Sequence, residues 1–293
     1  MTTASDATTG SDPTTSRGTA RSAAVLIALA AATAAPFYAL LHHLQAQGRS
    51  AAAMSMPSMH MENTAVFWAF PLIQATGIAA LLWSYAGVLL GLLEAGQRPS
   101  WWPWSGPATL RTHRHISLIV LALTLVHAAA TAGDAMGDSW LSAFVPGQAS
   151  WHDAVTAYNL GILALYCAVL LGPTYYLRKV LGARVWRFLH RFVLVVYVLS
   201  VGHALLLGAD FSHYAWVRPA TWLAQIPLLA LFARRLWPTG VTWSTATAVR
   251  RGAAVASAVL AAGVFLLVLT GNSDVPEGVH GGGHHHSSEH HHH

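Results

Sequence analysis

The sequence predicts an all-α, polytopic membrane protein, a helical bundle of about seven spans. Apolar residues make up 54% of the 293 residues and charged residues only 9%, whereas a soluble domain carries about 25% charged residues. The apolar residues also gather into long runs, and about 20 apolar residues in a row are what a helix needs to cross a membrane. The basic residues behind the net charge of +5 lie between these runs, so they do not indicate a nucleic-acid partner.

Seven apolar runs follow one another along the chain. They cover residues 23–42, 64–93, 115–133, 155–177, 186–207, 217–236 and 253–270. The first run resembles a signal peptide in having small residues after a short apolar stretch, but the long leader before it favours an uncleaved span. Residues 1–22, before that run, are rich in Thr, Ser, Ala and Gly and predict a disordered tail.

The basic residues set the expected orientation of the spans. Fourteen of the 16 lysines and arginines precede the first run or lie around the links after the second, fourth and sixth runs. Only Arg49 and Arg218 fall on the other side. Since basic residues concentrate on the cytoplasmic side of membrane proteins, we expect a cytoplasmic N-terminus and an extracytoplasmic C-terminus in a bacterial cell membrane.

These observations divide the chain into five parts. We expect a disordered cytoplasmic tail at 1–22, a first span with its outer loop at 23–63, a core of five spans at 64–236, a final span at 237–271, and a His-rich extracytoplasmic tail at 272–293. That tail is either native or an expression tag, and its interruptions by Gly, Ser and Glu favour a native segment. Cys167 is the only cysteine, which excludes a disulfide framework and a metal site built from cysteines.

Two of the apolar runs carry nearly the same histidine pattern. Each begins with a His-Arg pair and has a second histidine thirteen or fourteen residues after the first. The residues are His113, Arg114 and His127 in one run, and His190, Arg191 and His203 in the other. A lone histidine in such a run is more often a hydrogen-bonded structural residue. Four in matched positions predict ligands instead, because polar groups are costly inside a membrane and usually mark function.

The predicted orientation makes these two spans parallel, so their histidines should meet at two depths. We expect His113 beside His190 toward the cytoplasm. We expect His127 beside His203 toward the outer face. Fourteen helical residues separate the two levels by about 21 Å, which suits two hemes stacked across a hydrocarbon core about 30 Å thick. The bundle is therefore expected to bind heme in its core.

The cytoplasmic level leaves two questions open. Thirteen residues place His190 about 140° away from the face of His203 on a straight helix, so we expect a kink, a bulge or local tightening between them. His115 is an alternative to His113, which we prefer because it shares the His-Arg pattern. Arg114 and Arg191 are candidates for pairing with heme propionates, or they only follow the charge rule for cytoplasmic loops.

The histidine pattern resembles the ferric reductase-like transmembrane domain, which is shared by NADPH oxidases, ferric reductases and a bacterial heme subunit that serves a periplasmic methionine-sulfoxide reductase. The resemblance covers roughly residues 64–236. It implies two b-type hemes per chain, held by His113 with His190 and by His127 with His203, and electron flow from the cytoplasm outward. The chain departs from the oxidases in showing no dinucleotide fingerprint, so we expect a separate cytoplasmic flavoprotein, ferredoxin or quinol as the electron donor.

A second candidate site lies in the expected loop between the first two runs. Four methionines and one histidine fall within eight residues there, namely Met54, Met56, Met59, His60 and Met61. Thioethers and imidazole suit copper(I), so this loop is a candidate site for an outer copper or iron ion. The alternative is a flexible linker.

The sequence therefore predicts an oxidoreductase that carries electrons across the membrane to an outer acceptor, with ferric or cupric ion favoured. One alternative is a heme-bearing subunit that feeds a periplasmic reductase, with a protein as its acceptor. Another is a membrane protein that handles metal ions without redox chemistry, in which the histidines bind the ion directly.

Overall fold

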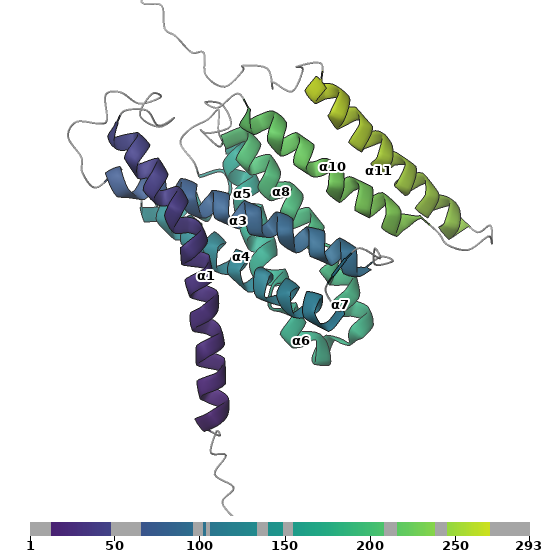
Figure 1. Ribbon diagram of the computed structural model, residues 1–293, viewed down its shortest axis with the longest axis horizontal. Helices are drawn as coiled ribbons and strands as arrows, with labels where there is room; N and C mark the ends of the chain where they lie inside the picture. Colours follow the sequence, from purple (N-terminus) through teal and green to yellow (C-terminus); the bar gives the residue numbers. More distant parts are fainter. Residues whose placement is uncertain are drawn as a thin grey trace, which may run out of the picture.

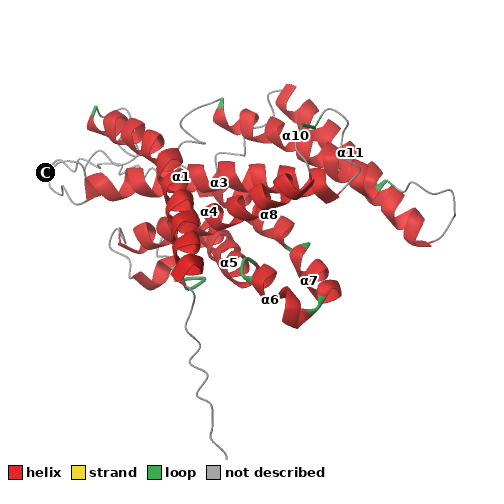
Figure 2. Cartoon of the chain, turned by 60° about the horizontal axis from the view of Figure 1, so that its bottom comes forward, coloured by secondary structure: helices red, strands yellow, loops and turns green. Residues whose placement is uncertain are grey.

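The computed structural model describes residues 13–47, 66–95, 102–103, 106–133, 140–148, 155–207, 216–237 and 245–269. Within these ranges the chain is helical and contains no strand (Figure 2). The helices are α1 (Pro13–Ala46), α3 (Val66–Ala95), α4 (Gly106–Gly133), η2 (Trp140–Ala143), α5 (Val155–Leu171), α6 (Thr174–Leu181), α7 (Ala183–His190), α8 (Val193–Leu207), α10 (Val217–Leu236) and α11 (Thr245–Leu269). The predicted all-α class is confirmed.

Four helical segments are long and apolar enough to cross a membrane. They are Ser22–Ala46, Trp68–Glu94, Gly106–Gly133 and Ala183–Leu206. The pair α5 and α6, bent by 49° at a short break, makes a fifth if it is one span. The chain is therefore an integral membrane protein. Because α10 and α11 lie at the last two predicted runs but are not among these segments, the count of seven stays a prediction.

Several helix boundaries differ from those expected, and two of the differences have a clear local cause. α1 begins at Pro13, so residues 13–22, assigned above to a disordered tail, are helical. Proline is favoured at the first helical position because its fixed φ suits a helix and its missing N–H would have no partner there. The fourth run is divided between α5 and α6 at Gly172 and Pro173, because proline has no N–H for the helix and restricts the residue before it.

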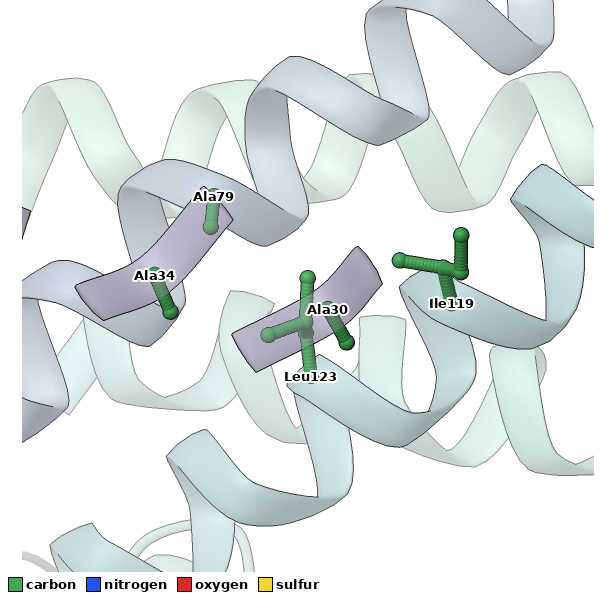
Figure 3. Close-up of a cluster of buried hydrophobic side chains, with 5 residues drawn as sticks. All are labelled: Ala30, Ala34, Ala79, Ile119 and Leu123. Carbon is green, nitrogen blue, oxygen red and sulfur yellow. The ribbon is translucent and has the colours of Figure 1, made fainter. Parts of the chain in front are cut away.

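Small residues bring the first three long helices together. Ala30 and Ala34 of α1, Ala79 of α3, and Ile119 and Leu123 of α4 form one buried cluster (Figure 3). Alanine lets helix backbones approach closely, which is how helices commonly pack in membranes. The N-terminal part of α1 extends beyond the bundle (Figure 1).

A second cluster joins α3, α8 and α10. It consists of Leu92, Tyr197, Val201, Leu205 and Leu228. The Tyr197 hydroxyl donates a hydrogen bond to Oε1 of Gln225, at 3.0 Å, which satisfies a buried phenol within the bundle. α10 and α11 lie side by side at one edge (Figure 1). In this packing α3 lies against α4 and α5 against α8, so that each of these two histidine-bearing helices has a long helix beside it.

Candidate functional site

The structure brings the four histidines together in the two expected combinations. The ring centroids of His113 and His190 lie 6.0 Å apart, with 87° between the ring planes. Those of His127 and His203 lie 6.1 Å apart, with 85° between the planes. Following the expected orientation, we call His113 with His190 the inner pair and His127 with His203 the outer pair.

Of the two candidates at the inner level, His113 is the one that meets His190. Its side chain is half-buried between α4 and α3, whereas the side chain of His115 is exposed. The two residues are two positions apart, so they point to different sides of α4. The geometry therefore supports His113 over His115.

A break in the helix reduces the angular offset that the thirteen-residue spacing would otherwise place between His190 and His203. α7 ends at His190 and α8 begins at Val193. Around the break the backbone forms tighter bonds, with Arg191 N–H donating to the Phe188 carbonyl at 3.2 Å and Phe192 N–H to the Leu189 carbonyl at 3.0 Å. Such 3₁₀ steps turn the chain by about 120° instead of about 100° per residue. The extra rotation moves His190 toward the face of His203, as the predicted tightening requires.

Three of the four rings are anchored on a neighbouring helix by the same hydrogen bond. Nδ1 of His113 lies 3.0 Å from the Gly87 carbonyl, Nδ1 of His127 lies 2.9 Å from the Ile73 carbonyl, and Nδ1 of His203 lies 2.8 Å from the Ala157 carbonyl. A carbonyl only accepts, so Nδ1 carries the proton and donates. This tautomer leaves Nε2 with a free lone pair, and metal-binding histidines are commonly oriented in this way.

Each anchoring carbonyl is followed four residues later by a glycine. The acceptors at 73, 87 and 157 precede Gly77, Gly91 and Gly161. A Cβ at Gly77 or Gly91 would lie 3.2 or 3.3 Å from an imidazole atom, and a Cβ at Gly161 would lie 2.7 Å from the His203 ring. One helical turn separates the two positions, so the glycine opens the surface through which the ring reaches the carbonyl.

The sequence analysis did not identify these glycines as part of the site, although their spacing in the sequence is a signal of it. Gly77 and Gly91 are fourteen residues apart on α3, the same spacing as His127 and His113 on α4. This shared spacing becomes informative only when the register between the antiparallel helices α3 and α4 is known, because each glycine must then face one histidine.

The fourth ring is held differently. His190 stacks on the indole of Trp186 in the same helix, with the centroids 5.2 Å apart and 20° between the planes. Trp186 also makes a T-shaped contact with Tyr175 of α6, with the ring centroids 6.3 Å apart. The guanidinium carbon of Arg114 lies over the Tyr175 ring, 5.7 Å from its centroid. Arg191 is exposed at the helix break. A pairing of Arg114 and Arg191 with heme propionates stays a prediction.

The donor set of each pair fits a heme better than a bare metal ion. A metal–imidazole bond is about 2.0–2.1 Å long, and with the ring centre about 1.1 Å beyond the nitrogen, two imidazoles on opposite sides of one metal would have centroids roughly 6.3 Å apart. The observed separations are close to this value. A bare transition-metal ion usually takes three or four protein ligands, and no group of three or more His, Cys, Asp or Glu side chains occurs among the described residues. A heme needs only two axial ligands, because the porphyrin supplies the rest.

The outer site predicted in the first loop lies outside the described residues. This applies to Met54, Met56, Met59, His60 and Met61, and also to the His-rich tail at 272–293. The copper or iron site there stays a prediction.

Residues 76–201 match the family described as "Ferric reductase like transmembrane component". The matched segment includes His113, His127 and His190 and ends two residues before His203. No curated protein and no solved structure matches the chain. The family match agrees with the apolar helices and with the paired histidines at two levels. The match supports a ferric reductase-like transmembrane domain in this part of the chain, and with it a transmembrane electron-transfer, reductase-like role.

Proposed function

We propose that the chain binds two b-type hemes and moves electrons across the membrane, from a cytoplasmic or quinol donor to extracytoplasmic ferric or cupric ion. The observation that carries the proposal is the pair of 6 Å histidine contacts, each between perpendicular rings on α4 and on the α7–α8 segment. With both axial positions filled by histidine, a heme has no open coordination site and supplies one-electron transfer rather than oxygen activation.

The chain's own residues hold and orient the two sites. The carbonyls of residues 73, 87 and 157 fix the proton of three imidazoles on Nδ1, so that Nε2 of each is available to iron. Both levels lie on α4, fourteen residues or about 21 Å apart along its axis, so each electron would cross most of a membrane core about 30 Å thick. Arg114 would neutralise a propionate at the inner level.

The inner level is also where a donor would dock. Four basic residues of α6 and α7 are exposed around the inner pair, namely Arg178, Lys179, Arg184 and Arg187. A cytoplasmic flavoprotein or a ferredoxin with an acidic surface would be steered to them, whereas a quinol would reach the inner heme through the lipid. At the outer level we propose the Met/His loop at 54–61 as the place that gathers the metal acceptor.

The test is a reduced-minus-oxidised absorption spectrum of the purified chain, with heme quantified per chain and reoxidation followed after mixing with ferric chelate or cupric ion. We expect two low-spin hemes and rapid reoxidation by both metals. His127→Ala and His203→Ala should each remove one heme and leave the other spectrally intact, whereas His115→Ala should retain both.

The alternatives correspond to different outcomes. Hemes that are reoxidised only by a separate periplasmic protein would make the chain the membrane subunit of a periplasmic reductase. A folded chain without heme that binds metal ions would make it a metal-handling protein without redox chemistry. Retention of both hemes in the His127 and His203 variants would refute the assignment of the outer pair.

A further inference from the structure

The two histidine pairs are anchored unequally. Both rings of the outer pair donate Nδ1–H to a backbone carbonyl, but in the inner pair only His113 does so. The His190 ring has no hydrogen-bond partner within the described part of the chain, and its close neighbour is the stacked indole of Trp186. One of the four proposed ligands therefore depends on an aromatic contact where the others use the backbone.

The path of the chain explains why the fourth carbonyl is missing. The Ala157 carbonyl near the start of α5 serves His203. Because α5 and α8 are antiparallel, an equivalent acceptor for His190 would lie about thirteen residues later, near the end of α5. There α5 stops at Leu171, and the Gly172–Pro173 break turns the chain by 49° into α6. The straight part of α5 thus ends at the level where His190 would need a carbonyl.

We propose that Trp186 is a positioning residue of the inner heme, fixing the plane of His190 by stacking and donating its Nε1–H to a propionate of that heme. This inference rests on the proposed heme function. The Trp186 Nε1 atom is buried and has no hydrogen-bond partner among the described residues. Buried N–H groups are almost always paired, and a propionate is an acceptor that the cofactor itself would bring.

The unequal anchoring makes the two sites electronically different. A hydrogen bond from Nδ1 to a carbonyl raises the basicity of the ligand, and a more basic ligand stabilises ferric over ferrous iron. The outer heme has two such bonds and the inner heme has one. The inner heme therefore has the higher reduction potential of the two. Arg114, on the inner level, acts in the same direction because positive charge favours the reduced state.

The experiment compares Trp186→Leu, which removes the ring, with Trp186→Phe, which keeps an aromatic face but has no N–H. Phe188→Leu is the matched control, because Phe188 lies on the same helix with 58% of its surface exposed. Each purified variant is examined by electron paramagnetic resonance of the ferric hemes, by redox titration, and by the rate of heme transfer to apomyoglobin. The inner heme is identified as the signal that is lost in His190→Ala.

In the wild-type protein the inner heme should titrate at the higher potential. Trp186→Leu should shift the resonance signal of the inner heme and release that heme several-fold faster, with the outer heme unchanged. Trp186→Phe should keep the signal but lower the inner potential, because the propionate charge has lost its donor. Phe188→Leu should resemble the wild type.

Three results would overturn the inference: an inner heme at the lower potential, a Trp186→Leu variant with an unchanged inner signal and release rate, or equal effects on both hemes. A wild-type protein without two hemes would instead refute the proposed function.

Discussion

At the scale of single residues, the candidate site depends on side chains that are absent as much as on those present. Gly77, Gly91 and Gly161 each leave the space that an imidazole fills. Glycine lowers the stability of a helix by about 1 kcal/mol relative to alanine, so three glycines facing three histidines are unfavourable for the helices themselves. The space that they leave is what lets the imidazoles reach the carbonyls.

Gly161→Ala should therefore empty the outer site, even though alanine favours the helix. A Cβ at this position would lie 2.7 Å from the His203 ring, so the ring must move away from the Ala157 carbonyl. We expect the heme content to fall from two toward one per chain, measured by heme extraction and absorption spectroscopy. The control is Gly202→Ala, where the new Cβ would meet only Leu160 at 3.4 Å. Two hemes in Gly161→Ala would show that His203 does not need this anchor.

At the scale of helices, the apolar runs predicted the elements well and their ends poorly. The helix that corresponds to the run at 115–133 starts earlier, at Gly106. The run at 155–177 corresponds to two helices, which are separated by Gly172 and Pro173. Hydropathy reports what a segment can bury, whereas helix ends depend on local backbone chemistry. The pairing of the histidines followed from charge and spacing. The role of the glycines did not, because it requires the register between neighbouring helices, and the contact of Trp186 with His190 was not considered, although both lie one helical turn apart in α7.

The break between α7 and α8 should set the register of the inner site. Inserting one alanine between Phe192 and Val193 would rotate His190 by about 100° relative to His203. We expect the inner heme to be lost while the outer heme remains, which the heme content per chain and the resonance spectrum would both report. One alanine inserted between α10 and α11 is the control and should leave two hemes. If the first insertion also retains both, the break does not determine the inner site.

At the scale of the whole molecule, the two histidine levels and the distribution of charge predict a direction for the bundle in the membrane. The exposed basic residues of α6 and α7 lie at the inner level, and the Met/His loop at 54–61 belongs to the predicted outer side. If the basic surface receives the proposed donor and the loop gathers the proposed metal acceptor, the two histidine pairs would provide the path between them.

Deleting residues 54–61 should therefore change the rates of electron transfer to the two metal acceptors to different extents. In proteoliposomes with reduced heme, an impermeant ferric chelate added outside takes electrons at the outer face without needing thioethers. Cupric ion yields copper(I), which thioethers bind well. We expect the deletion to slow reoxidation by cupric ion several-fold and to leave the ferric rate nearly unchanged. The ferric rate in the same vesicles also measures the fraction of chains facing outward, so the ratio of the two rates is independent of orientation. An unchanged ratio would show that the Met/His loop takes no part in delivering electrons to copper.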